Sequence, residues 1–179
     1  MHPSCEEFVR RICTRERIEG KRVLEVGAFN VNGSPRNWLR PHSPAWYVGV
    51  DLSPQPGYVD LVLDASRLGD VFAAGAFDVV ISTEALEHAE HWQEFVTSCK
   101  RALRPGGLLL VTARGPGKPR HDYPADYWRF IVQDFYQIFA ADSEPIAVEN
   151  DPGEPGVLSA WTYVGPPADL SGITVAQVD

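Results

Sequence analysis

Three groups of residues in this sequence combine side chains that could do chemistry. The first is a row of carboxylates that each end an apolar run: Glu25 in VLEVGAFNVNGS, Asp51 in YVGVD and Asp64 in VDLVLD. A carboxylate can accept two hydrogen bonds at once, which suits the hydroxyl groups of a bound ribose. A single acid in such a place caps a turn in many proteins, but three at successive strand ends indicate a ligand site.

The loop after Glu25 favours one kind of ligand. A dinucleotide pyrophosphate needs a G-x-G-x-x-G turn at a helix N-terminus, whereas Phe29 and Val31 stand where the later glycines would fall. A glutamate at the start of the loop suits a cation such as an α-amino group. The loop therefore predicts adenosine that carries a positively charged group, rather than NAD.

The second group, TEALEHAEH, places Glu84, Glu87 and His88 three and four residues apart. On a helical turn these side chains share one face, and oxygen ligands with imidazole suit Mg²⁺, Mn²⁺ or Zn²⁺. The alternative is a helix start without a metal, in which His88 lines the pocket.

The third group is GPGKPRHDYPADYWRF at 115–130, part of an irregular stretch at 114–130 that we expect to form a lid over the acceptor. His121 is the first candidate for a general base, because imidazole titrates near neutral pH, and His88 is the second. Lys118, Arg120 and Arg129 would bring positive charge to the pocket mouth.

Aromatic side chains in the same segment allow two interpretations. His121, Tyr123, Tyr127 and Trp128 could stack on a flat or sugar-like acceptor. Alternatively, the aromatic residues anchor the loop to the core, the interpretation we favour for Trp128 and Phe130. Arg129 could equally pair with a neighbouring acid, Asp122 or Asp126.

Alternating strand-like and helix-like patterns must position these groups. Apolar runs predict strands over 22–26, 47–51, 59–64, 77–83, 108–113, 145–151 and 157–165, and amphipathic patterns predict helices over 4–17, 34–40, 91–103 and 132–140. Such alternation predicts a mostly parallel sheet covered on both faces. Ligands of such sheets bind at the carboxyl ends of the strands, where the three acids lie.

Composition narrows the class of protein. A chain of 179 residues with 44% hydrophobic residues suits a single domain over 1–179, with a helix inside 1–19. The net charge of −8 counts against a nucleic-acid partner. No apolar run approaches the roughly 20 residues of a membrane span, and the N-terminus lacks a secretory pattern. Three cysteines without C-x-x-C spacing favour reduced thiols and a cytoplasmic location.

In this order and spacing, VLEVGAFNVNGS, YVGVDLSP, LVLDASRL, FDVVISTEALEH and LRPGGLLLVTARG resemble the successive motifs of class I S-adenosylmethionine-dependent methyltransferases of the type 11 group. The resemblance covers about residues 20 to 165. It implies a Rossmann-like α/β fold with a seven-stranded, mostly parallel sheet and an antiparallel last strand. It also implies S-adenosylmethionine as the cofactor.

The same resemblance implies which residues contact the cofactor. Glu25 and Gly27 would flank its methionine part, and Asp51 would hold its ribose. Only Gly27 matches the G-x-G-x-G loop of the family, so other residues of the loop are expected to replace the lost contacts. The full cofactor set is Glu25, Gly27, Asn30, Asn32, Gly33, Asp51, Leu52, Asp64, Ala65 and Thr83.

The E-x-x-E-H pattern is similar to the metal-binding element of two O-methyltransferase groups, one acting on small-RNA 3′ ends and one in ubiquinone synthesis. The implied metal ligands are Glu84, Glu87, His88 and His121. The main prediction is methyl transfer to a hydroxyl, or less readily an amine, of a small-molecule or sugar-like acceptor. The alternatives are a metal-dependent RNA 2′-O-methyltransferase and a non-catalytic cofactor-binding module that regulates a partner.

Overall fold

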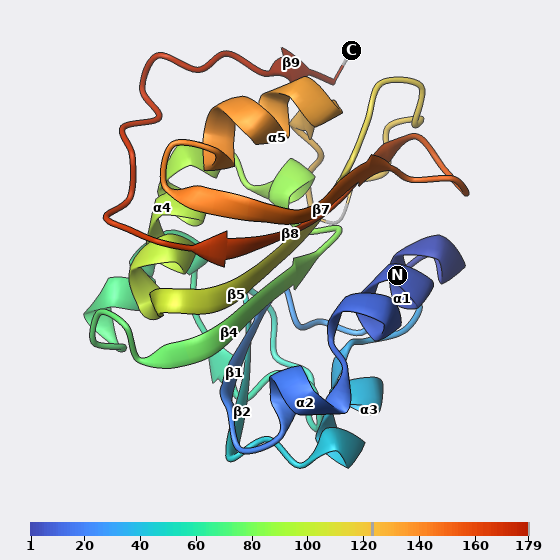
Figure 1. Cartoon of the computed structure of the whole chain (residues 1–179). Helices are drawn as coiled ribbons and strands as arrows, with labels where there is room; N and C mark the ends of the chain where they lie inside the picture. Colours follow the sequence, from blue (N-terminus) through green and yellow to red (C-terminus); the bar gives the residue numbers. More distant parts are fainter. Residues whose placement is uncertain (123, 179) are drawn as a thin grey trace.

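A seven-stranded sheet runs through the protein, in the order β3-β2-β1-β4-β5-β8-β7 (Figure 1). The structure is a computed structural model that describes residues 1–122 and 124–178. The strands of this sheet are β1 (Arg22–Val26), β2 (Trp46–Asp51), β3 (Leu61–Val62), β4 (Phe77–Thr83), β5 (Leu103–Arg114), β7 (Ser143–Asn150) and β8 (Gly156–Tyr163). Strands β1 to β5 are parallel, whereas β8 is antiparallel to both β5 and β7. The predicted fold class is therefore confirmed.

Helices cover both faces of the sheet, with α4 and α5 on one side and α1, α2 and α3 on the other (Figure 1). The α-helices are α1 (Pro3–Ile12), α2 (Arg15–Ile18), α3 (Arg36–Leu39), α4 (Trp92–Ala102) and α5 (Val132–Phe139), and the 3₁₀ helices are η1 (Arg40–His42), η2 (Ala65–Asp70) and η3 (Leu86–His88). The apolar stripe predicted for α4 is buried, with Trp92, Phe95, Val96 and Cys99 in one core cluster. Buried residues of α1 form a second cluster on the opposite face.

The single helix predicted over 4–17 is wrong. Helix α1 starts at Pro3, which suits a first turn because proline has no N–H to satisfy there. Its cap is the His2 ring, which accepts the Ser4 N–H. The helix ends at Ile12, and α2 begins at Arg15. This break allows Ile18 to join the core cluster that contains Ile12.

Two strand predictions also need correction. Strand β3 covers only Leu61–Val62, shorter than the predicted 59–64. Residues 128–129, predicted to be irregular, form β6 (Trp128–Arg129), which pairs with β9 (Ala176–Gln177). No local pattern indicates β6, because its partner lies in a distant part of the chain.

A buried guanidinium ties α3 to the edge of the sheet. Arg36 is only 3% exposed, and it lies over the Tyr47 ring and pairs with Asp60. The Asp60 carboxylate also accepts the N–H of Gly49 at 2.7 Å. A Cβ at Gly49 would lie 2.2 Å from the carbonyl oxygen of Tyr58 and 2.7 Å from the Arg36 guanidinium. Only glycine leaves room for this packing.

We therefore expect Gly49→Ala to lower the free energy of unfolding by about 1–3 kcal/mol or more, because a methyl group must displace backbone or the Arg36 pair. The matched control is Gly69→Ala, since a Cβ there meets nothing within 4 Å. Urea unfolding of both variants measures the difference. Equal stability of the two variants would contradict the packing argument.

Candidate functional site

A cavity of about 560 Å³ opens at the carboxyl ends of β1, β2 and β4. This volume is in the range of small-molecule sites, roughly 300–1,000 Å³. Residues of the predicted cofactor set that line it are Glu25, Gly27, Asn32, Gly33, Asp51, Leu52, Asp64, Ala65 and Thr83. The structure thus brings almost the whole predicted set to one cavity, although its segments are distant in sequence.

Asn30 is the member of that set that does not line the cavity. Its side-chain oxygen accepts the Gly33 N–H at 2.7 Å, and its own N–H donates to Gln55 Oε1 at 2.6 Å. Asp51 accepts the Phe29 N–H at 3.0 Å. These bonds shape the loop after β1 without the glycines of the usual motif, so Asn30 supports the loop from within.

Gly27 is the glycine that the loop requires. Its φ is +80°, and a Cβ there would lie 2.4 Å from the Cβ of Ala85. Its N–H donates to the Val50 carbonyl at 2.9 Å. The turn after β1 therefore packs directly against the turn that follows β4, at the floor of the cavity.

Glu25 is buried, and its carboxylate accepts hydrogen bonds from Ser34 Oγ at 3.0 Å and Tyr47 Oη at 2.8 Å. Burial raises the pKa of the Glu25 carboxyl to about 7, although both bonds and the nearby Arg36 favour its charged form. The Arg36 Nε lies 4.0 Å from the carboxylate. Glu25 is thus a support of the loop as well as a wall of the cavity, and its contact with a cofactor ammonium stays a prediction.

The wall between β2 and η2 combines polar and apolar groups. Leu52 is 55% exposed and lines the cavity, so a ligand bound there would contact it. Asp64 caps η2, accepting the Ser66 N–H and hydroxyl at 2.8 Å each. Asp64 is therefore both a helix cap and a wall residue of the cavity, and its contact with a ligand stays a prediction.

Glu84 does not join the predicted metal ligands. Helix η3 begins only at Leu86, and Glu84 has a φ of +52°, so the helical spacing assumed for these residues is wrong. The Glu84 carboxylate accepts the His2 N–H at 3.2 Å and pairs with Arg114. Arg114 also bonds Asp151 at 3.0 Å. Glu84 thereby connects β5 to the start of α1.

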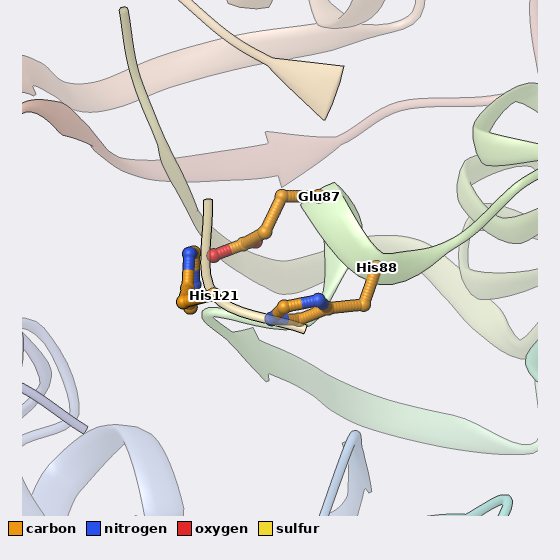
Figure 2. A group of neighbouring side chains, drawn as sticks. All are labelled: Glu87, His88 and His121. Carbon is orange, nitrogen blue, oxygen red and sulfur yellow. The ribbon is translucent and has the colours of Figure 1, made fainter. Parts of the chain in front are cut away.

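Glu87, His88 and His121 do come together. One potential ligand atom from each lies within 4.8 Å of the others. Figure 2 shows the Glu87 side chain extending toward His121, with the His88 ring entering the same space. The rings of His88 and His121 meet edge to face, with centroids 4.9 Å apart. Both histidines line the cavity, and Glu87 lies behind them, fully buried.

The hydrogen bonds of the two histidines determine their neutral tautomers. His88 Nδ1 lies 2.5 Å from the Ala125 carbonyl oxygen, which can only accept a proton. His121 Nδ1 lies 3.3 Å from the Pro119 carbonyl oxygen, which likewise can only accept, and 2.9 Å from the Asp126 carboxylate. Both Nδ1 atoms therefore donate, and each Nε2 keeps a lone pair. Burial lowers the pKa of His88, which favours this neutral form.

Asp126 is a site residue that the sequence analysis considered only as a partner of Arg129. It is 3% exposed, accepts the backbone N–H of His121 at 2.9 Å and pairs with the Arg129 guanidinium, and its carboxylate lies 2.9 Å from His121 Nδ1. Its spacing of five residues from His121 has no helical or strand periodicity, so no sequence pattern indicated the contact.

The positive charge expected at the pocket mouth is balanced by acids. Each cation of the lid segment pairs with a carboxylate: Lys118 with Glu154, Arg120 with Asp122 and Arg129 with Asp126. The cavity wall contributed by this segment consists of His121, Asp122, Pro124, Ala125 and Tyr127.

Tyr123, which we expected to stack on an acceptor, lies outside the described residues. Trp128 and Phe130 anchor the segment as expected, since Trp128 Nε1 donates to Ala89 O at 2.9 Å and Phe130 is buried.

Comparison with known proteins places this geometry in a family. Residues 24–111 match a family model described as a methyltransferase domain. The chain is 34% identical to phthiotriol/phenolphthiotriol dimycocerosates methyltransferase 1 of Mycobacterium ulcerans over 65% of its own length and 46% of that protein. It is also 34% identical to a fatty-acid O-methyltransferase of Mycolicibacterium smegmatis, over 60% of this chain and 41% of that one. The chain thus spans about half the length of these curated relatives or less.

A solved structure shares the fold. The Burkholderia thailandensis 1,6-didemethyltoxoflavin-N1-methyltransferase, which has S-adenosylhomocysteine bound, aligns with a TM-score of 0.72 at 14% identity. The alignment covers 91% of this chain and 79% of that one. Residues 24–111 thus form a methyltransferase domain, and the predicted resemblance to class I S-adenosylmethionine-dependent methyltransferases is confirmed. Among the described residues, no helix has the length and apolar character needed to cross a membrane.

The buried Glu25 generates a pH prediction. In the folded protein the pKa of the Glu25 carboxyl is about 7, above the ordinary value of 4.5. Between pH 4.5 and pH 7, Glu25 therefore keeps its proton in the folded protein and loses it in the unfolded chain. The contribution of this carboxyl to stability is present below pH 4.5 and is lost as the pH rises through 7. Relative to Glu25→Gln, the wild type should lose up to about 3 kcal/mol of unfolding free energy between pH 4 and pH 8. Urea unfolding at both pH values measures this, and parallel curves for the two proteins would contradict it.

Proposed function

We propose that the chain transfers a methyl group from S-adenosylmethionine to a hydroxyl group of a small-molecule or sugar-like acceptor, with an amine as the less favoured acceptor. The observation that carries the proposal is a single cavity that joins the strand-end acids to a corner formed by His88 and His121. The names of its relatives, which include a fatty-acid O-methyltransferase, support an oxygen acceptor.

The residues of the cavity fit this cofactor. Asp51 suits the ribose hydroxyls, and the exposed Leu52 offers an apolar surface to the adenine. Glu25 and Gly27 line the part expected to hold the methionine moiety, and Thr83, which also lines the cavity, would face the reacting methyl group. When bound, S-adenosylmethionine supplies a methyl group on a sulfonium sulfur. In the transfer, the acceptor oxygen takes the methyl group and the sulfur is the leaving group. The contribution of the chain is mainly to position the reactants and to exclude water.

The histidine corner is where the acceptor would be activated. His88 and His121 keep an Nε2 lone pair each, and both rings line the cavity. The segment 114–130 serves in this proposal as the acceptor lid, and residues 1–179 as one domain. A cytoplasmic location, consistent with three free and buried cysteines, is part of the same proposal.

Two alternative functions are less well supported. An RNA acceptor requires cations that contact phosphates, but Lys118, Arg120 and Arg129 are paired with acids. A non-catalytic cofactor-binding module has no need for two histidines with oriented Nε2 lone pairs at the cavity wall. Turnover of an acceptor distinguishes that module from an enzyme.

S-adenosylhomocysteine should bind this cavity, and Asp51→Ala should weaken binding by about 1–3 kcal/mol, because the ribose hydroxyls lose a charged partner. The matched control is Asp70→Ala, which removes an exposed carboxylate paired with Arg67 on η2. Calorimetric titration of both variants measures the affinity. Binding of NAD in place of S-adenosylhomocysteine would overturn the cofactor assignment.

His121→Ala should lower turnover by roughly 10²–10⁴-fold if the corner activates the acceptor, with cofactor affinity nearly unchanged. His42→Ala is the control, because His42 lies on η1 and does not line the cavity. A screen of hydroxylated acceptors followed by steady-state kinetics measures both variants. Unchanged turnover in His121→Ala would show that positioning alone suffices.

A further inference from the structure

The Glu87 side chain is in an unusual state for a carboxylate. It is 0% exposed, and neither of its oxygens has a partner at hydrogen-bond geometry within the described part of the chain, although the backbone N–H groups of Glu87 and Arg114 and the Arg129 guanidinium favour its charged form. A buried carboxylate without partners is costly, and such groups are normally paired or bound to a metal. The neighbouring groups that face it are His88, His121 and the Asp126 carboxylate behind His121.

The two histidines are prepared to act as ligands. Metal-bound histidines donate their other ring N–H to a carboxylate or a backbone carbonyl, which orients the ring. His121 Nδ1 donates to the Pro119 carbonyl and His88 Nδ1 donates to the Ala125 carbonyl, so the Nε2 of each neutral ring offers a lone pair. Figure 2 shows both rings and the Glu87 carboxylate converging on one space.

We infer that Glu87, His88 and His121 bind one divalent transition-metal ion, such as Zn²⁺ or Mn²⁺, with its remaining positions open to the cavity. Nitrogen ligands favour such ions over Mg²⁺ or Ca²⁺, which prefer oxygen. Ligands about 2.1 Å from a metal lie roughly 3–4 Å from one another. The three ligand atoms, within 4.8 Å of one another, need only a small contraction to reach this geometry.

The role of this ion rests on the proposed function. An acceptor hydroxyl at an open position loses its proton to water more readily, because the cation stabilises the oxyanion. That oxygen then forms a bond to the methyl carbon, the C–S bond breaks, and the sulfur keeps the electron pair. His121 Nε2 is occupied by the metal in this arrangement, so His121 acts as a ligand rather than as the general base.

Metal binding can be tested without an acceptor. Chelator-treated and dialysed protein is titrated with Zn²⁺, Mn²⁺ and Mg²⁺ in a calorimeter, and crystals soaked in Zn²⁺ or Mn²⁺ are examined for anomalous scattering. We expect one site per chain for Zn²⁺ or Mn²⁺, weaker binding of Mg²⁺, and an anomalous peak between the three side chains.

Variants assign the ligands. Glu87→Gln and His121→Ala should each lower metal affinity by at least about 100-fold, because even loss of a supporting group costs 10- to 100-fold. Glu84→Gln is the matched control: it removes a nearby carboxylate that points away, toward Arg114, and should leave metal affinity unchanged. Thermal unfolding and S-adenosylhomocysteine affinity verify that each variant is folded.

The outcomes separate the two proposals. Absence of a stoichiometric metal site in folded wild-type protein that binds S-adenosylhomocysteine would overturn the metal inference and leave the proposed function standing. Loss of metal binding in Glu84→Gln, with metal binding retained in Glu87→Gln, would also overturn the metal inference. A protein that binds Zn²⁺ through Glu87 but does not bind S-adenosylhomocysteine would retain the metal site and overturn the proposed function.

Discussion

The buried guanidinium of Arg36 is the interaction on which the cofactor side of the molecule depends. It lies between the Glu25 carboxylate of β1 and Asp60, which precedes β3, and it packs on Tyr47 of β2. A buried charge is tolerated only when its partners are well placed, so these elements are held in one arrangement. This explains how a loop with few glycines can follow β1. Charged and hydrogen-bonded groups packed against the loop set its position. A glycine is required only at Gly27, where the backbone comes close to Ala85.

The acceptor side depends on a different kind of contact. Helix η3, which carries Glu87 and His88, is bonded along its backbone to the segment that carries His121. Tyr127 N–H donates to the Glu87 carbonyl at 2.9 Å, and the Trp128 indole donates to the Ala89 carbonyl. The histidine corner is therefore assembled by two segments that position each other. A change in the backbone of either segment would move one imidazole relative to the other.

Charge is distributed in a way that suits a cationic cofactor. The chain has a net charge of −8, and the cations of the lid segment are each paired with a carboxylate. The cavity wall itself contains Glu25, Asp51, Asp64 and Glu84. Acidic groups in a partly enclosed cavity favour a positive ligand more strongly than they would in open water.

The sequence by itself determined the fold class, and it predicted a set of residues of which nearly all line one cavity. The position of the strand-end acids can be predicted from the sequence, because parallel strands bring their carboxyl ends to one edge of the sheet regardless of how the side chains pack. Only the tertiary structure decided the rest. Glu84 and Glu87 are three residues apart, yet they face different partners, because Glu84 lies before the helical turn and pairs with Arg114 of β5. Asn30 is turned into its own loop, and Asp126 reaches His121 through an irregular segment. These placements depend on contacts between distant segments. The spacing of apolar and polar residues along the chain carries no information about such contacts.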